Sequence, residues 1–181
     1  LALTINFSIR YTKNNFLGKL SSFLSIGYAI PGLILAVGIT RFLVFADRNI
    51  FSDLDFVITG SLVGLVLAYI IKSYALANSS IESGYERISN SIDNSARLLG
   101  ARGSILLGKV HFPLMKTSFL TAILLVTSEV VKELPATLIL RPFNFDTLAV
   151  VTYTYAAEER MYQAAMPSLA IVLIGIVPLI F

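Results

Sequence analysis

The sequence predicts an all-α integral membrane protein, and composition and patterning both support that fold class. Hydrophobic residues make up 56% of the chain and charged residues only 14%, with a mean hydropathy of +0.79. A soluble domain carries about 25% charged residues. The net charge of +3 is small and scattered, which disfavours nucleic-acid binding. The sequence has no cysteine, so disulfides, thiolate catalysis and cysteine-ligated metals are excluded within it.

Four segments are apolar and long enough to cross a bilayer as helices, for which about 20 residues suffice. These predicted spans are residues 20–45, 54–77, 114–138 and 161–181. The first contains Tyr28 and the pair Pro31-Gly32, which we interpret as a packing and kink device, with a gating hinge as the alternative. Both ends of the chain look cut, because residues 1–10 resemble the tail of an upstream helix. We therefore expect a piece of a longer polypeptide.

The distribution of Lys and Arg between the loops predicts the orientation, because cytoplasmic loops carry the excess of positive charge. One side holds Arg10, Lys13, Lys19, Lys72, Arg87, Arg97, Arg102, Lys109 and Lys116. The other side holds Arg41, Arg48, Arg141 and Arg160, diluted by Asp47, Asp53, Asp55, Asp146, Glu158 and Glu159. The long polar insert at about residues 79–112 is therefore predicted to be cytoplasmic, and the loops near 46–54 and 139–160 to face outward.

The second outward loop is predicted to contain a short helix. Asp146 is a suitable N-cap for a helix that runs to about Ala157, with Leu148, Val151 and Tyr155 on one apolar face. The helix lies at the membrane interface or dips back between the spans, and the sequence does not decide between these. Tyrosines in this loop are explained by anchoring at the interface rather than by metal ligation.

The insert is predicted to contain a short amphipathic helix. Asp93 is placed to cap it, Ala96, Leu98 and Leu99 form an apolar patch, and Gly100 is a natural terminator. Because an isolated helix of this length is unstable in water, it must dock on something. One interpretation is a helix lying on the lipid headgroups. His111 has no carboxylate or second histidine within motif range, so a metal or catalytic role for it is disfavoured.

The spacing in the insert favours docking on a protein. Asn94-Ser95-Ala96 is followed after three residues by Gly100, and nine residues later by Val110-His111-Phe112-Pro113. This resembles the signature of permeases from binding-protein-dependent ABC importers: E-A-A, three residues, Gly, nine residues, I-x-L-P. The last Ala, the Gly and the Pro are in register, whereas Asn94 and Ser95 depart from the pattern. The residues assigned to this predicted coupling motif are Asn94, Ser95, Ala96, Leu98, Leu99, Gly100, Val110 and Pro113.

Three further stretches are similar to the iron(III)-type branch of that family. They are "SIGYAIPGLILAVGI" (residues 25–39), "KELPATLILRPFNFDTLAVVTYTYA" (residues 132–156) and "AAMPSLAIVLIGIVP" (residues 164–178). The resemblance covers residues 20–181 and implies most of the second half of a permease made of two fused halves. It also implies the helical bundle of type I importer permeases, with a cytoplasmic coupling helix, in the bacterial inner membrane.

The resemblance implies a pore subunit that hydrolyses nothing and holds no cofactor of its own. ATP is expected on partner ATP-binding subunits, whose groove receives the coupling helix, and a periplasmic binding protein is expected to deliver the substrate. Ala96 and Gly100 are small enough for close approach, Leu98 and Leu99 suit a hydrophobic cleft, and Pro113 is expected to start the third span. Ferric iron is the expected substrate. Polyamine, sulfate, thiamine and phosphonate are the alternatives within the same class.

Charged residues near the end of the third predicted span form a second candidate site. Glu129 is spaced for one helix face with Lys132 (i, i+3) and with Glu133 (i, i+4), and Pro135 follows. Charges at such depth are costly and usually face a cavity or a bundle interior. We predict that these three residues line the translocation path or its gate, with a local ion pair at the outer surface as the alternative. An ion-coupled secondary transporter is a less favoured class, and an intramembrane enzyme is disfavoured because the sequence shows no paired nucleophile and base and no metal-ligand set.

Overall fold

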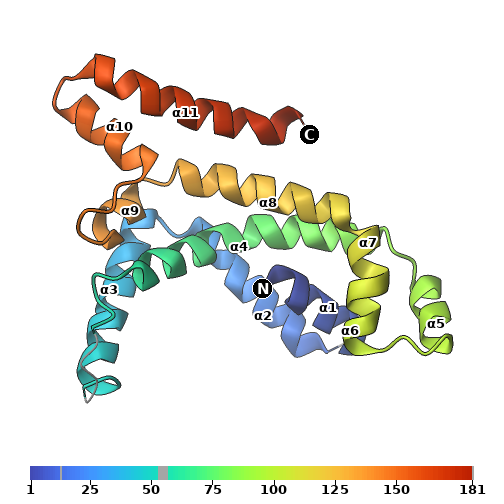
Figure 1. Cartoon of the computed structure of the whole chain (residues 1–181). Helices are drawn as coiled ribbons and strands as arrows, with labels where there is room; N and C mark the ends of the chain where they lie inside the picture. The colour runs from blue at the N-terminus through green and yellow to red at the C-terminus, as the bar shows by residue number, and fades with distance from the viewer. Residues whose placement is uncertain (13, 53–56, 181) are drawn as a thin grey trace. The chain divides into compact units, whose positions relative to one another are not determined.

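The computed structural model describes residues 1–12, 14–52 and 57–180. These residues form helices joined by turns and irregular segments, with no strand among them (Figure 1). The all-α fold class predicted from the sequence is therefore confirmed. The predicted start of the second span at Leu54 and the end of the fourth at Phe181 lie outside the described residues, as do Lys13, Asp53 and Asp55 from the charge count.

The helices follow one another closely along the chain. In order they are α1 (Ala2–Thr12), α2 (Asn15–Ser25), the 3-10 helix η1 (Ile26–Ala29), α3 (Gly32–Asn49), α4 (Leu62–Glu86), α5 (Asn90–Leu98), α6 (Gly103–Ile105), the π-helix η2 (Leu106–His111), α7 (Phe112–Leu114), α8 (Lys116–Val131), α9 (Pro135–Leu140), α10 (Leu148–Ala157) and α11 (Met161–Ile180). They form two compact units, Leu1–Ile26 with Tyr74–Val126 and Gly27–Ser73 with Thr127–Phe181.

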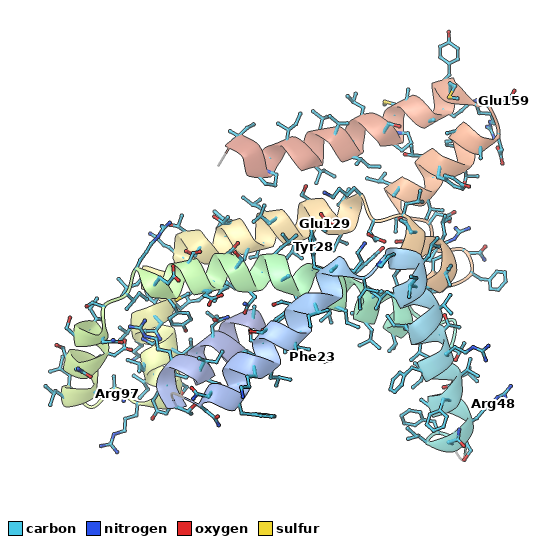
Figure 2. All side chains as sticks on the ribbon, turned by 180° about the vertical axis from the view of Figure 1, so that it is seen from behind. Phe23, Tyr28, Arg48, Arg97, Glu129 and Glu159 are labelled. Carbon is cyan, nitrogen blue, oxygen red and sulfur yellow. The ribbon has the colours of Figure 1, made fainter. Side chains whose placement is uncertain are left out.

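Two of the described helices are long and apolar enough to cross a membrane. They are α4 and the part of α11 at Met161–Pro178, and there are up to four spans if two broken helix pairs each count as one. The broken pairs join Asn15–Ala29 to Gly32–Asn49 and Gly103–Leu114 to Lys116–Val131. Large apolar side chains are exposed along these helices, such as Phe23 of α2 at 69% (Figure 2). Contiguous apolar surface of this kind marks contact with lipid or with a protein partner.

The first unit is built on α1, the second half of α4 and the first half of α8. Its core contains Ala2, Tyr74, Ile81, Tyr85, Ile88, Met115 and Ala122. Small residues bring α4 and α8 close together, because a Cβ on Gly84 would lie 2.8 Å from the Ser118 side chain. Beside this core a polar cluster joins α1, α2 and α4, in which Asn78 accepts hydrogen bonds from Asn6 (2.7 Å) and Ser21 (3.1 Å).

The second unit packs α3 against α9 and against the first half of α4. Its core residues are Leu35, Ala36, Ile39, Leu43, Leu65, Ala68, Ala136 and Leu140. Alanines lie at the centre of the contact, where Ala36, Ala68 and Ala136 are fully buried. In the same unit α10 and α11 fold back on each other as a helical hairpin (Figure 1).

The helix bounds differ from the predicted spans, and the helix of the second span begins only at Leu62, since residues 57–61 are not helical. Three further differences concern the breaks and ends of the spans. The first predicted span is interrupted, because the chain at Pro31 has φ −55° and ψ 134° and α3 begins afresh at Gly32. The helix of the second span continues past Ala77 to Glu86, so the insert starts later than predicted. The third span ends at Val131, before Pro135, which opens α9 instead. Proline explains the first and last differences, since it interrupts the hydrogen bonding of a preceding helix.

Candidate functional site

Helix α5 contains the first part of the predicted coupling motif and ends as the sequence indicates. Gly100 adopts φ +87°, a conformation that favours glycine. The amide of Gly100 donates to the carbonyl of Arg97 (3.0 Å), and that of Ala101 donates to Ala96 (2.9 Å). This pair of bonds is a Schellman motif, which satisfies carbonyls at the end of a helix. Gly100 therefore fixes the direction in which the chain leaves α5.

Most of the predicted motif residues lie on an exposed surface. Leu98 is 89% exposed and Leu99 is 88% exposed, so neither side chain is packed in a core of the described residues. Asn94, Ser95 and Gly100 are also exposed, and Ala96 is half-buried. The second part of the motif lies apart from this end of α5, with Val110 half-buried in η2 and Pro113 exposed in α7.

Pro113 does not start the third span directly. It lies inside the continuous helical segment Gly103–Leu114, which meets Lys116–Val131 at a bend of 79°. The break falls at Met115, whose side chain is buried in the core of the first unit. The π-helical stretch η2 occupies the middle of the segment, and such stretches are frequent at functional sites.

Asp93 is not the cap of α5, as the sequence suggested, but its buried attachment point. The helix begins after Ser89, and Asp93 lies one turn inside it, with a residual exposure of 6%. Its Oδ2 accepts a hydrogen bond from Nε of Arg10 in α1 (2.7 Å), and its Oδ1 lies 2.8 Å from Nε2 of His111 in η2. We call Arg10, Asp93 and His111 the α5 anchor.

The anchor corrects the prediction that His111 has no carboxylate partner. Burial by itself raises the pKa of Asp93, but the hydrogen bonds and charges of Arg10 and His111 outweigh it and bring the pKa below its ordinary value. Asp93 is thus ionised at neutral pH and only accepts hydrogen bonds, so Nε2 of His111 carries the proton of this bond. Nδ1 of His111 is buried and has no hydrogen-bond partner among the described residues. The rings of Phe7 and Tyr85 pack against the imidazole edge to face.

A buried ion pair forms the second candidate site, in the other unit. Nζ of Lys72 in α4 lies 2.5 Å from Oε2 of Glu133, and the two side chains are 16% and 8% exposed. The second carboxylate oxygen of Glu133 accepts the amide of Ala136 in the first turn of α9 (3.1 Å). Lys72 was counted with the cytoplasmic charges, and it lies within α4, as the predicted span at residues 54–77 implies. We call Lys72 and Glu133 the buried pair.

Close packing surrounds the buried pair. A Cβ on Gly32 would lie 2.6 Å from Oε1 of Glu133, so the first turn of α3 approaches the carboxylate closely. The hydroxyl of Thr137 donates to the carbonyl of Glu133, so it accepts from the hydroxyl of Tyr69, 2.7 Å away. The chain breaks at Pro31-Gly32 and before Pro135 therefore meet at a single polar cluster.

Glu129 and Lys132 form the predicted i, i+3 pair. Their charged atoms are 2.8 Å apart, with Lys132 58% and Glu129 18% exposed, and Figure 2 shows Glu129 on α8. The predicted shared face of Glu129 and Glu133 does not form, because α8 ends at Val131 and the i, i+4 spacing no longer holds. Glu133 is instead directed to Lys72.

The short helix after the 141–147 loop is present, but its cap differs from the prediction. The N-cap is Thr147, whose hydroxyl accepts from the amide of Val150, whereas Asp146 pairs with Arg141. Its buried residues are Ala149 and Val150 rather than the predicted face of Leu148, Val151 and Tyr155. Within residues 1–12, 14–52 and 57–180, no group of three or more His, Cys, Asp or Glu side chains is placed to hold a metal ion.

Comparison with known proteins identifies relatives among transport permeases. The chain is 25% identical over 152 residues to the Fe(3+)-transport system permease protein FbpB 2 of Haemophilus influenzae. It is 28% identical over 158 residues to the 2-aminoethylphosphonate transport system permease protein PhnV of Salmonella typhimurium, and equally so to PhnV of Salmonella choleraesuis. The chain resembles ABC transporter permeases. The family resemblance predicted from the sequence is therefore confirmed, while no family model matches the chain.

The similarity extends over most of this chain but over only part of the relatives. It covers 83% of the chain and 28% of the Haemophilus protein, and 87% of the chain and 57% of PhnV from Salmonella typhimurium. Both relatives are named as permeases, which are transport components, and the apolar helices of this chain agree with a multi-pass membrane protein.

Proposed function

We propose that this chain is part of the transmembrane permease subunit of an ATP-driven importer in a bacterial inner membrane. The similarity to two named transport permeases over more than four fifths of the chain carries the proposal. The subunit itself hydrolyses nothing. ATP is bound by separate ATP-binding subunits, and a periplasmic binding protein delivers the substrate. The spaced motif at residues 94–113 supports this over an ion-coupled carrier, which has no use for a docking helix.

In this proposal α5 is the coupling helix that docks on the ATP-binding subunit. Its exposed end supports that role, because Leu98 and Leu99 expose apolar surface that a partner cleft would bury. The Schellman motif at Gly100 turns the chain away immediately afterwards, which lets the helix end approach a partner closely. The Glu of the family pattern is replaced by Asn94, so docking here depends on shape rather than on a charge at that position.

Substitution of Gly100 tests the docking role. Gly100→Asp and Gly100→Arg should leave the membrane helices folded, because a Cβ at Gly100 meets nothing within 4 Å. They should nevertheless prevent co-purification of the full-length permease with its ATP-binding subunit, or abolish stimulated ATP turnover. Ala96→Trp should act similarly by overpacking a close contact. Gly108→Asp is the control, since Gly108 is exposed in the same insert and likewise has open space around it. Normal association and turnover in the Gly100 variants would refute the role.

Ferric iron is the proposed substrate, on the name of the Haemophilus relative, and 2-aminoethylphosphonate is the second candidate, on the name of the Salmonella relatives. The deciding measurement is uptake of radiolabelled ferric iron and of labelled aminoethylphosphonate by cells with and without the intact operon. Uptake of iron alone supports the first assignment. Uptake of aminoethylphosphonate, polyamine, sulfate or thiamine without iron replaces the substrate and leaves the transporter class standing.

Glu129, Lys132 and Glu133 are proposed to lie at the translocation path or its gate. The buried pair supports this, because an ionisable group inside a membrane segment is costly and is retained where it has a function. Glu133→Gln should reduce transport more than it reduces membrane expression or assembly with the ATP-binding subunit. If Glu129→Gln and Glu133→Gln both transport normally, the cluster only anchors the helix end.

A further inference from the structure

We propose that the α5 anchor is the mechanical connection through which movement of the coupling helix reaches the membrane helices, with Arg10 as its principal positioning residue. The inference rests on the proposed function, since it assigns how docking at α5 is transmitted. It concerns a set of contacts different from the exposed motif residues.

Asp93 is the only buried residue of α5. The neighbouring positions Ile92, Asn94 and Ser95 are exposed, and the apolar end at Leu98 and Leu99 contacts solvent rather than its own chain. A helix of nine residues is not stable by itself, so its attachment must come from tertiary contacts. The attachment of α5 is therefore mainly ionic and hydrogen-bonded through Asp93, with one further contact in which the guanidinium of Arg97 lies 4.9 Å from the ring centroid of Tyr11 in α1.

Arg10 connects this one side chain to the end of α4. Its Nε donates to Asp93, its Nη1 donates to the carbonyl of Tyr85 (2.9 Å), and its Nη2 donates to the carbonyl of Ile88 (2.7 Å). The last carbonyls of a helix have no partner within the helix, and a cation there is favourable. A single guanidinium thus ties α1, the end of α4 and α5 together, in a planar fork that a lysine cannot reproduce.

His111 connects the other carboxylate oxygen to the helical segment before α8. It is 1% exposed, and its ring is held between Phe7 and Tyr85. The two oxygens of Asp93 are therefore attached to two different elements, α1 on one side and η2 on the other. Displacement of α5 by a partner must move both elements or break buried charge-assisted hydrogen bonds, which are about twice as strong as neutral ones.

The geometry separates docking from transmission along α5. The docking residues lie at the exposed C-terminal end of the helix. Asp93 of the anchor lies nearer the N-terminal end and is buried. Loss of the anchor should therefore leave the partner bound while movement is lost between α5 and the membrane helices. Loss of the docking surface should instead prevent the partner from binding, while α5 stays attached to the membrane helices.

The test uses the full-length permease reconstituted with its ATP-binding subunit and binding protein. Three anchor variants are compared with the parent: Arg10→Gln, Arg10→Lys and Asp93→Asn. Each should co-purify with the ATP-binding subunit as the parent does, while the amount transported per ATP hydrolysed falls by about tenfold, a factor typical of the coupling between two sites. Arg10→Lys should recover only part of the loss. The matched controls are Arg87→Gln and Glu86→Gln, which remove exposed charges from the same region and should leave the ratio unchanged.

A second measurement on the permease alone makes the outcome independent of the partner. Trypsin should cut after the exposed residues Arg97 and Arg102 faster in Arg10→Gln and Asp93→Asn than in the two controls, because α5 is no longer held. An unchanged cutting rate, an unchanged ratio of transport to ATP hydrolysis, or loss of co-purification in the anchor variants overturns the inference. Failure of the parent permease to associate with any ATP-binding subunit overturns the proposed function instead, and the cutting rates still report on the anchor.

Discussion

The α5 anchor and the buried pair are two solutions to the same problem, a carboxylate removed from water in a largely apolar chain. Asp93 is held by a guanidinium and an imidazole, so each of its oxygens has its own side-chain partner. Glu133 has one lysine and one backbone amide. Loss of one side-chain partner therefore leaves Asp93 with another, whereas loss of Lys72 leaves Glu133 without its ion-pair partner.

The difference follows from where each carboxylate lies in its unit. Asp93 attaches a short exposed helix, and the hydrogen bonds that it accepts from different directions fix the orientation of that helix. Glu133 lies in the break between α8 and α9, beside the start of α3, where tight packing already fixes the backbone. We therefore expect loss of the anchor to affect mainly the transmission of movement, and loss of the buried pair to lower the stability of its unit as well as to impair transport. The following substitutions are designed to break or sharpen that contrast.

The largest effect is expected from Lys72→Met, which removes the positive charge beside Glu133 while Met keeps most of the volume of the Lys72 side chain. An uncompensated buried charge costs about 3–5 kcal/mol in the free energy of unfolding. Thermal unfolding of the purified full-length protein in detergent measures it. The double variant Lys72→Met with Glu133→Gln should recover most of the loss, because Gln still offers an oxygen to the Ala136 amide. Equal destabilisation in the single and double variants would show that charge is not the cause.

Gly32→Ala is expected to have the next largest effect. Its Cβ would lie 2.6 Å from the Glu133 carboxylate and 3.3 Å from the amide nitrogen of Ala136, and overpacking of this kind costs about 1–3 kcal/mol. Gly38→Ala is the matched control in the same helix, where a Cβ meets nothing within 4 Å. The control should stabilise α3 by about 0.5–1 kcal/mol. The two melting temperatures must therefore move in opposite directions, and parallel shifts would refute the close contact.

Gly100→Ala should have a smaller and local effect. With φ at +87°, a side chain with a Cβ costs about 1–2 kcal/mol in the left-handed region, although space around it is open. The loss is measured as faster hydrogen exchange of the amides at positions 100 and 101, which form the Schellman bonds. Gly100→Asn should be milder, because Asn tolerates this conformation. The contrary result, in which Asn and Ala exchange alike, would mean that the backbone conformation does not set the end of α5.

The smallest effect is expected from Glu129→Gln. Its pair with Lys132 is partly open to the surroundings, and exposed ion pairs contribute about 0–1 kcal/mol. Glu133→Gln, measured in the same unfolding experiment, should cost more because it leaves Lys72 without its counter-charge. A larger loss for Glu129→Gln than for Glu133→Gln would reverse the assignment of these two carboxylates.

The sequence alone predicted the features that depend on local chemistry. Long apolar runs in a chain with few charges predicted a helical membrane protein, because backbone groups in lipid must be satisfied within a helix. The spacing around Gly100 predicted where α5 ends, since a left-handed residue is required there. The i, i+3 pair of Glu129 and Lys132 was predicted correctly, because it depends only on helical spacing.

Only the tertiary structure decided which buried charges meet. Asp93 is paired with a residue 83 positions away, and Lys72 with one 61 positions away, so no motif window contains both partners. Local pattern suggested a cap role for Asp93, which was wrong, and it named no partner for Lys72 or for His111. A charged side chain that is removed from water is stable only when it is paired with an opposite charge or hydrogen-bonded. The packing of the helices decides which residues lie close enough to be that partner.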